Sequence, residues 1–308
     1  MKVVVLGGGL IGLASAYELL LDGHEVTVVD QDTVGGGATP GNAGWVCPSQ
    51  VGPLAAPGML RHSAGLLLKP SSPLWIAPTL DPAMLRFLLA FARRCNRRDH
   101  AEATSALVDL ASAVESDYAR LEDQLGPVGR VKAGVLSCFT DVDHARQAQQ
   151  HWNDVARVTG TGPGPLLDAA AMAATEPALS RDVVGGFVLE ADSHLDPAVL
   201  AKTLFAALQG ATLVEGAGRC TLLRSGNRVR GVRSASAGEL EADQVVIAAG
   251  AGSATYLRSL GVRVPLVAGT GYSFSVRPSA VPAMPLHLEE AHVACTPLSG
   301  ALRVAGTM

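Results

Sequence analysis

The feature that most constrains this chain is a glycine-rich turn between a strand-like run and a helical pattern. Residues 3–6 are apolar and mostly β-branched, which is typical of a strand buried on both faces of a parallel sheet. The sequence Gly-Gly-Gly-Leu-Ile-Gly follows at 7–12, and apolar residues then recur at helical spacing to residue 21. A second strand-like run occupies residues 25–29. This order predicts a βαβ unit of about 30 residues.

The glycines of the turn match the pattern G-x-G-x-x-G, in which each has a separate steric task. Gly7 permits the tight turn, Gly9 lets a pyrophosphate approach the backbone, and Gly12 lets the helix pack against the strand. The amides and dipole of a helix N-terminus also favour phosphate. Asp30 ends the second strand, where a carboxylate binds a ribose diol and disfavours the 2′-phosphate of NADP. The alternative, a glycine-rich turn without a ligand, is the weaker one in this context.

The residues after Asp30 favour FAD over NAD. A nicotinamide enzyme normally continues into a third βα unit, whereas residues 35–58 lose regular periodicity and are rich in Gly, Pro, Ala and Ser. A loop of this length is more often a functional segment than a simple connector. Its small residues and backbone donors can lie flat against an extended cofactor.

Hydrophobic patterning predicts the remaining elements. Helices are expected at 82–94, 105–125, 141–158, 197–208 and 253–260. Strands are expected near 131–139 and 184–190, in a cluster at 212–215, 220–223 and 229–233, and at 244–249. The last run is fully apolar, so we expect it to return to the sheet opened by residues 3–6.

The predicted fold class is α/β, with a doubly wound Rossmann-like FAD-binding domain and an interleaved α+β substrate domain. Residues 1–80 and 195–260 are assigned to the discontinuous FAD-binding domain. Residues 81–194 and 261–308 are assigned to the substrate domain.

Composition excludes several classes of protein. The formal net charge of the 308 residues is -4, so no global basic field attracts nucleic acid, and no nucleic-acid partner is expected. The five cysteines include no C-x-x-C pair, which argues against a disulfide framework or a zinc site and favours the cytoplasm. Three consecutive glycines interrupt the apolar N-terminus where a signal peptide would continue. No apolar stretch approaches the roughly 18 residues that span a bilayer.

Two interpretations of residues 59–98 remain open. Arg93, Arg94, Arg97 and Arg98 crowd the end of the predicted helix at 82–94. They can complement the dipole of a core-facing helix. Alternatively, together with the leucines at 66–68 and Trp75, they can form a peripheral contact with the inner face of a membrane.

Taken together, the motifs resemble the N-terminal half of bacterial D-amino acid dehydrogenases, within the wider D-amino acid oxidase and glycine oxidase superfamily. The likeness extends through essentially the whole chain in the same order. The segments that carry it are 7–12, Asp30, 39–44, Cys47-Pro48, 55–58, Glu176-Pro177, 192–197, 248–250, 271–273 and 303–306.

The resemblance implies a set of FAD-binding positions. The pyrophosphate would be held by Gly7, Gly9, Leu10, Ile11 and Gly12. The adenosine ribose would be bound by Asp30, with Gln31 beside it, and Thr39, Asn42, Ala43 and Gly44 would approach the flavin ring or its phosphates. Arg219 stands where the family usually has a valine whose backbone holds the adenine, although Cys220 suits an apolar position better. Ala248, Ala249 and Gly250 match a second cofactor-contacting strand end, with Ala249 where a threonine is common.

The resemblance also implies oxidative deamination of a D-amino acid to a 2-oxo acid and ammonia. Electrons would then pass to a quinone, another carrier or oxygen. The flavin accepts the hydride, so the protein must position the substrate Cα–H and bind its carboxylate. Tyr272 is one candidate for the substrate side, although it can also be a packed strand residue. His194 is the other, although the residues favour an ordinary loop position for it, with Asp196 as a cap or hinge. No metal site is expected.

Two rival functions remain. One is oxidation of a secondary amine such as sarcosine, proline or hydroxyproline. The other is a non-catalytic FAD-binding subunit that needs a partner chain. In the family, a further segment carries a Gly-x-Arg-Pro motif that binds the substrate carboxylate, and the motif does not occur in these 308 residues. We therefore expect a complete site for the ADP half of FAD, and a flavin-ring pocket that stays open unless a second polypeptide closes it.

Overall fold

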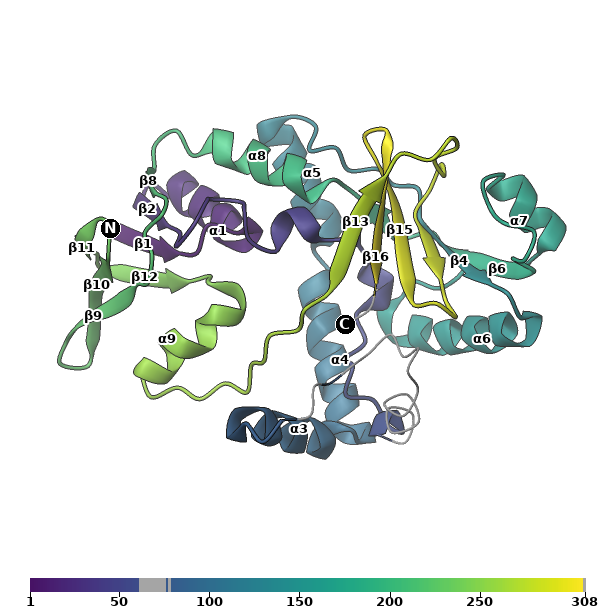
Figure 1. Cartoon of the computed structure of the whole chain (residues 1–308), viewed down its shortest axis with the longest axis horizontal. Coiled ribbons are helices and arrows are strands. Elements are labelled where there is room, and N and C mark those ends of the chain that lie inside the picture. Colours follow the sequence, from purple (N-terminus) through teal and green to yellow (C-terminus); the bar gives the residue numbers. More distant parts are fainter. Residues whose placement is uncertain (61–75, 77–78, 307–308) are drawn as a thin grey trace. The chain divides into compact units, whose positions relative to one another are not determined.

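The computed structural model describes residues 1–60, 76 and 79–306 (Figure 1). The chain folds into two compact units, and each is built from two separated segments. The first unit contains Met1–Asn42 and Pro197–Ala268. The second unit contains Ala43–Asp196 and Gly269–Met308.

A four-stranded parallel sheet forms the centre of the first unit, in the order β12-β1-β2-β8. Its strands are β1 (Lys2–Leu6), β2 (Glu25–Val29), β8 (Thr212–Val214) and β12 (Gln244–Ile247). Helix α1 (Leu10–Leu21) packs against β1, β2 and helix α8 (Pro197–Ala207). Strand β1 is buried on both faces, as its uninterrupted apolar run predicted. The mixed α/β class with a parallel sheet is therefore confirmed.

The opposite face of this sheet is covered by an antiparallel ribbon of β9 (Thr221–Ser225), β10 (Arg228–Ser234) and β11 (Gly238–Glu241). Val4 and Leu6 of β1 pack there against Val232 of β10 in one apolar cluster. The 3-10 turn η3 (Gly250–Gly252) and helix α9 (Ser253–Ser259) follow β12. The return of the 244–249 run to β1 is confirmed by its parallel pairing.

A seven-stranded sheet forms the centre of the second unit, in the order β13-β16-β15-β14-β4-β6-β5 (Figure 1). Its strands are β4 (Val135–Phe139), β5 (Leu167–Asp168), β6 (Gly185–Leu189), β13 (Tyr272–Val276), β14 (Leu286–Leu288), β15 (Val293–Leu298) and β16 (Ala301–Gly306). Neighbouring strands are antiparallel, except that β4 and β14 are parallel. Helix α6 (Val142–Thr159) packs on β4 and β6, and helix α7 (Ala169–Thr175) packs on β5 and β6.

Among the described residues, the second unit also contains α3 (Pro82–Arg94), α4 (Arg97–Ala111), α5 (Val114–Leu125), β3 (Trp45–Val46), η2 (Pro48–Gln50) and β7 (Ser193–His194). The 3-10 turn η1 (Thr39–Gly41) belongs to the first unit. Helix α3 begins after Asp81, whose carboxylate accepts from the Ala83 amide. None of the helices in the described part of the chain combines the length and apolarity that a membrane crossing needs.

The structure differs from the sequence prediction in several places, among them helix α7 and strands β11 and β13 to β16, which the patterning did not predict. The single helix expected at 105–125 is two helices, α4 and α5, which are separated at Ser112 and Ala113. The run at 212–215 joins the parallel sheet as β8, whereas it was assigned to the short-strand cluster. The loop at 35–58 contains the short elements η1, β3 and η2. Strands β8 and β3 form through distant partners, since β8 pairs with β2 and β3 pairs with β7.

The boundaries of the two units also differ from the predicted ranges. The prediction kept residues 1–80 together, whereas the chain enters the second unit at Ala43. Trp45 pairs there with His194 of β7, and Ser49 is hydrogen-bonded to Asp192. The second crossing, at Pro197, is close to the predicted residue 195, and the third lies at Gly269 where residue 261 was predicted.

Candidate cofactor-binding site

Two of the three motif glycines in the turn, Gly7 and Gly12, are packed closely against backbone atoms, whereas Gly9 has free space beside it. Gly7 has φ +113°, and a Cβ there would lie 2.4 Å from the Ala248 carbonyl oxygen. A Cβ on Gly12 would lie 1.8 Å from the Gly7 carbonyl oxygen. By contrast, the nearest atom to a Cβ on Gly9 is Thr39 Oγ1, at 3.9 Å. The open space beside Gly9 is where a pyrophosphate fits, so the residues present fit the cofactor expected from the sequence.

The N-terminus of α1 provides the donors of this site. Its N-cap residue, Gly9, makes no side-chain cap, and the first amides of a helix have no intrahelical acceptor. Thr39 Oγ1 accepts from the Leu10 amide at 3.3 Å, which joins η1 to the turn. Ile11 is 73% exposed at the same helix end. The positive end of the helix dipole therefore faces an accessible surface, which favours an anion.

Asp30 is fixed beside the turn by two backbone amides. Its Oδ2 accepts from the Gly8 amide at 2.7 Å, and its Oδ1 accepts from the Asp32 amide at 2.9 Å. Each carboxylate oxygen has about two acceptor positions, so both can accept once more. This geometry suits the two hydroxyl groups of a ribose diol.

The segment that follows β8 runs alongside Asp30 and Gln31. The amides of Ala217 and Gly218 donate to the carbonyl oxygens of Asp30 and Gln31, at 2.9 and 3.2 Å. Cys220 is 5% exposed within the apolar cluster of the first unit, whereas Arg219 is exposed. Burial raises the pKa of the Cys220 thiol, and nearby Asp30 raises it further. Cys220 therefore occupies the apolar position, and Arg219 remains the candidate for the adenine side.

The end of β12 meets the glycine turn. The Ala248 amide donates to the Leu6 carbonyl at 2.8 Å, and the Ala248 carbonyl lies against Gly7. Ala249 precedes Gly250, whose φ is +53°. Gly7, Asp30 and Ala248 thus follow the carboxyl ends of three neighbouring parallel strands, where open α/β sheets bind ligands.

The other predicted flavin contacts lie near the crossing into the second unit. Asn42 is the last residue of the first segment of the first unit, and Ala43 and Gly44 are the first two residues of the second unit. The Gly44 carbonyl accepts from the Leu195 amide at 2.9 Å. The next residue, Trp45, donates from Nε1 to Thr296 Oγ1 at 2.8 Å and meets the His287 ring edge-on at 5.6 Å between centroids. No local pattern indicates a role for Trp45, because its hydrogen-bond partner Thr296 is 251 positions away in the sequence.

The two candidates for the substrate side have different environments. Tyr272 is 71% exposed on the edge strand β13, whereas His194 is 4% exposed in the β3–β7 ribbon. Burial lowers the pKa of His194, and a hydrogen bond with the Pro297 backbone partly opposes this shift. Its Nδ1 atom has no hydrogen-bond partner among the described residues. His194 is therefore a buried neutral imidazole rather than an ordinary loop residue.

Asp192, two positions before His194, is a buried carboxylate that accepts hydrogen bonds from η2. No local sequence pattern indicated these contacts. The Asp192 carboxylate is 1% exposed and accepts from the amide and hydroxyl of Ser49 and from Gln50 Nε2. Burial and the neighbouring Asp192 raise the pKa of the Cys47 thiol, so Cys47 is protonated at neutral pH. Asp192 therefore ties η2 to the segment that carries β7.

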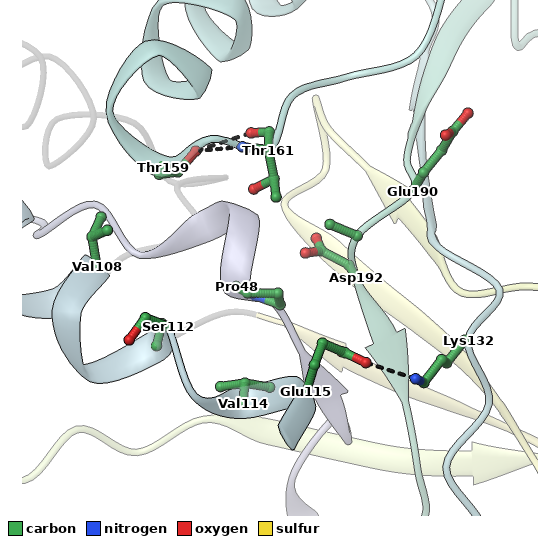
Figure 2. A pocket seen from close by; sticks show the side chains of 12 residues that line it. Pro48, Val108, Ser112, Val114, Glu115, Lys132, Thr159, Thr161, Glu190 and Asp192 are labelled. Atoms are coloured by element: carbon green, nitrogen blue, oxygen red, sulfur yellow. Dashed lines mark hydrogen bonds and ion pairs between the residues drawn. The ribbon is translucent and has the colours of Figure 1, made fainter. Parts of the chain in front are cut away.

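Asp192 also lines a cavity of about 350 Å³ in the second unit (Figure 2). Its walls come from η2, the α4–α5 junction, the end of α6 and the segment before β7. Glu115 at its edge bonds Lys132 at 2.6 Å and the buried Arg130, and the hydrogen bonds from both cations lower the pKa of Glu115. Within the described ranges, no group of three or more His, Cys, Asp or Glu side chains is placed to hold a metal ion.

Comparisons with known proteins agree with this geometry. The family model described as FAD dependent oxidoreductase (DAO) matches residues 2–308. The D-amino acid dehydrogenase of Rhizorhabdus wittichii is 34% identical over 317 residues, which covers 99% of this chain and 75% of that protein. The fold resembles glycine oxidase from Bacillus cereus (TM-score 0.63, 19% identity, 100% of this chain and 72% of that one). It also resembles L-proline dehydrogenase from P. horikoshii (TM-score 0.63, 17% identity, 99% and 69%).

Proposed function

The chain belongs to the family of FAD-dependent oxidoreductases, and on that premise we propose that it oxidatively deaminates D-amino acids. The substrate loses its Cα hydrogen with an electron pair, and an amine proton, to leave an imino acid. Water hydrolyses the imino acid to a 2-oxo acid and ammonia. Bound FAD supplies the acceptor for the hydrogen and the electron pair. The observation that carries the proposal is the likeness, over nearly the whole chain, to the D-amino acid dehydrogenase of Rhizorhabdus wittichii.

In this proposal the first unit binds the ADP half of the cofactor. The amides at the start of α1 hold the pyrophosphate in the space beside Gly9, and the fixed carboxylate of Asp30 accepts from the ribose hydroxyls. Thr39 holds η1 against the helix N-terminus through the Leu10 amide. The geometry of these residues supports the assignment, because it combines an anion site with a diol acceptor at one sheet edge.

The substrate side of the proposal rests on the second unit. Ala43 and Gly44 approach the flavin ring, and the strand that follows them is anchored through Trp45. Tyr272 stays a candidate for contact with the substrate, since its exposed side chain is accessible to a ligand. His194 stays a candidate for orienting neighbouring groups, since burial keeps it neutral.

An anaerobic reduction assay tests the reaction. The purified protein is expected to carry FAD, identified after denaturation by chromatography, and D-alanine is expected to bleach its visible absorption. L-Alanine and sarcosine are the matched controls, because they share the size of D-alanine but differ in configuration or in the position of the methyl group. D-Proline and L-proline extend the panel to cyclic secondary amines.

Each outcome of this assay separates the candidates. Bleaching by D-alanine and not by L-alanine supports the proposal. Bleaching by sarcosine or L-proline alone contradicts it and favours a secondary-amine oxidoreductase, a class for which the fold likeness to L-proline dehydrogenase gives a reason to test. Reduction by dithionite but by no amine favours the non-catalytic FAD-binding subunit.

We further propose that electrons leave to a quinone or another carrier, and that α3 contacts the inner face of a membrane peripherally. Helix α3 has no buried residue, and Leu85 and Leu89 on it are 49% and 51% exposed. Arg93 and Arg94 occupy its last turn. This combination of an exposed apolar stripe and cationic residues suits an interfacial helix. The leucines at 66–68 and Trp75, which belong to the same predicted segment, lie outside the described residues.

A further inference from the structure

The cavity in the second unit has two kinds of lining (Figure 2). Apolar side chains of α4 and α5 line one part, among them Val108, Ala111 and Val114. Polar side chains line another part, among them Thr161, which follows α6, and Asp192, which precedes β7. The volume of about 350 Å³ lies at the small end of the range of roughly 300–1,000 Å³ for small-molecule sites. The cavity therefore suits a small ligand that has both an apolar and a polar part.

Asp192 gives this lining a negative charge without a cationic partner. It is 1% exposed, and its carboxylate accepts hydrogen bonds from Ser49 and Gln50, which are neutral. The neighbouring Cys47 thiol is also neutral, because burial and Asp192 raise its pKa. In the part of the chain that the structure describes, neither Asp192 nor Glu190 is ion-paired with a Lys or Arg side chain. Buried carboxylates usually have such a partner.

The Thr161 hydroxyl faces the same space. Its Oγ1 atom is buried and has no hydrogen-bond partner among the described residues. Thr159 holds the backbone of Thr161 in place, because Thr159 Oγ1 donates to the Thr161 carbonyl at 2.9 Å. Figure 2 shows the Thr161 hydroxyl and the Asp192 carboxylate directed toward one shared space, whereas the Glu190 carboxylate points away from it. A hydrogen-bond donor in this space would satisfy the hydroxyl, which is costly to bury without a partner.

A single ammonium group satisfies both side chains. It carries a positive charge and three donors, so it can compensate Asp192 and donate to Thr161. Water can satisfy a hydroxyl, but it leaves the charge of Asp192 without a counter-ion. The apolar lining from α4 and α5 favours a short hydrocarbon chain on the same ligand. The lining thus indicates a small organic cation.

The cavity does not suit a ligand that also carries a carboxylate. Lys132 is the one cation among the described residues that line it, and Lys132 already pairs with Glu115 at 2.6 Å. The buried Arg130 is bonded to Glu115 and Ser193. A ligand carboxylate would therefore meet acidic side chains without an uncommitted cation. The cavity favours a simple amine over a zwitterionic amino acid.

From this combination we propose that the cavity binds a small alkylammonium ion, with its charged group between Asp192 and Thr161 and its carbon chain against α4. The inference goes beyond the proposed function, because it concerns an amine without a carboxylate. The bound amine would contact the carboxylate that anchors η2. That turn begins at Pro48, shortly after Gly44 of the loop that is expected to approach the flavin.

The test uses the FAD-loaded protein and butylammonium chloride, with isothermal titration calorimetry as the readout. 1-Butanol is the control ligand, because it has the same carbon chain without the charge. Thr161→Val removes the hydroxyl, and Thr203→Val is its matched control because Thr203 lies in the first unit. Ala111→Leu fills the cavity, and Ala106→Leu is its matched control because Ala106 is an exposed residue of the same helix.

We expect butylammonium to bind at one site per chain and 1-butanol not to bind measurably. Thr161→Val should weaken binding about tenfold, the scale of one hydrogen bond to a charged group. Ala111→Leu should abolish binding, because the larger side chain occupies the place of the carbon chain. Asp192→Asn keeps the shape of the side chain without its charge, so a loss of about 10- to 100-fold is expected. Both control variants should bind as the unaltered protein does.

Three results would overturn the proposal. They are the absence of saturable binding by the unaltered protein, equal binding of 1-butanol, and unchanged affinity in Thr161→Val or Ala111→Leu. Circular dichroism melts show whether each variant is folded, and the first two results do not depend on any variant. None of the three bears on the proposed function, because the reduction assay with amino acids is a separate measurement.

Discussion

At the scale of single residues, neighbouring glycines of one turn have different consequences when replaced. Gly9 has φ -69°, which any residue adopts, and a Cβ there meets no protein atom closer than 3.9 Å. Gly12 has no space for a side chain, because an added Cβ would lie 1.8 Å from the Gly7 carbonyl oxygen. The first glycine is required by the ligand, and the second is required by the packing of helix against strand.

We therefore expect Gly9→Val to fold normally and to be purified without FAD, because the added side chain occupies the place of the pyrophosphate. Gly12→Ala should instead lower the melting temperature, since a backbone oxygen must move. Circular dichroism melts measure the fold, and the ratio of flavin to protein absorbance measures the cofactor. A Gly9→Val protein that retains stoichiometric FAD would show that the pyrophosphate lies elsewhere.

His194 provides a pH-dependent prediction. Its pKa in the folded chain is lowered by burial from the usual 6.5. Below about pH 6.5 the unfolded chain therefore takes up a proton that the folded chain does not, and the free energy of unfolding falls as the pH drops. Above that pH both states are neutral at this residue, and its contribution is fully present.

We expect the unaltered protein to lose more stability between pH 7.5 and 5.5 than His194→Gln does, when both are unfolded with urea. His151→Gln is the control because His151 is exposed. Equal pH dependence in the unaltered protein and His194→Gln would mean that His194 becomes protonated in the folded state.

At the scale of elements, a buried carboxylate joins the end of α7 to the segment before β14. Glu176 is 3% exposed, and its two oxygens accept from the amides of Ala178 and Ala283 at 2.9 and 2.7 Å. The two amides are more than 100 positions apart. This contact explains the Glu176-Pro177 motif structurally, without a catalytic role.

Glu176→Ala should therefore destabilise the protein by about 2–6 kcal/mol, because it leaves two amides without an acceptor at about 1–3 kcal/mol each. Chemical denaturation of the FAD-loaded protein measures this loss. Glu190→Ala, an exposed carboxylate of the same unit, should change stability by less than about 0.5 kcal/mol. A similar small effect at Glu176 would contradict the anchoring role.

At the scale of the whole molecule, the interaction of α3 with lipid is open to direct measurement. Two of the nearby arginines are ion-paired, Arg94 with Asp99 and Arg98 with Glu102, which weakens their attraction to anionic lipid. Apolar insertion and charge attraction are both needed for stable interfacial binding. We expect the protein to sediment with anionic vesicles at low salt.

The double variant Leu85→Ser, Leu89→Ser should abolish this sedimentation. Leu110→Ser is the matched control, because Leu110 is 78% exposed on α4. If the double variant and the unaltered protein sediment equally, α3 is not the contact. If neither sediments, the proposal of membrane association fails.

The sequence by itself determined the features that depend on local sterics. The βαβ unit, the limits of α1 and β2, the positive φ of Gly7 and the close contact of Gly12 with Gly7 all lie within the first 30 residues. The choice of FAD over NAD also came from a neighbouring segment, the loop after Asp30. Residue types at close spacing predicted that the glycine turn and Asp30 meet at the sheet edge, where the Gly8 amide donates to the Asp30 carboxylate. Ala248, more than 200 positions away, was included only through the family resemblance.

Only the tertiary structure decided the second unit and the crossing between the units. Trp45 meets Thr296 across a sequence separation of 251, and Ser49 meets Asp192 across 143. No local pattern encodes such pairs, because strand register depends on how distant segments align and pack. The same reason explains why the position of Tyr272 on the edge strand β13 followed only from the pairing of β13 with β16.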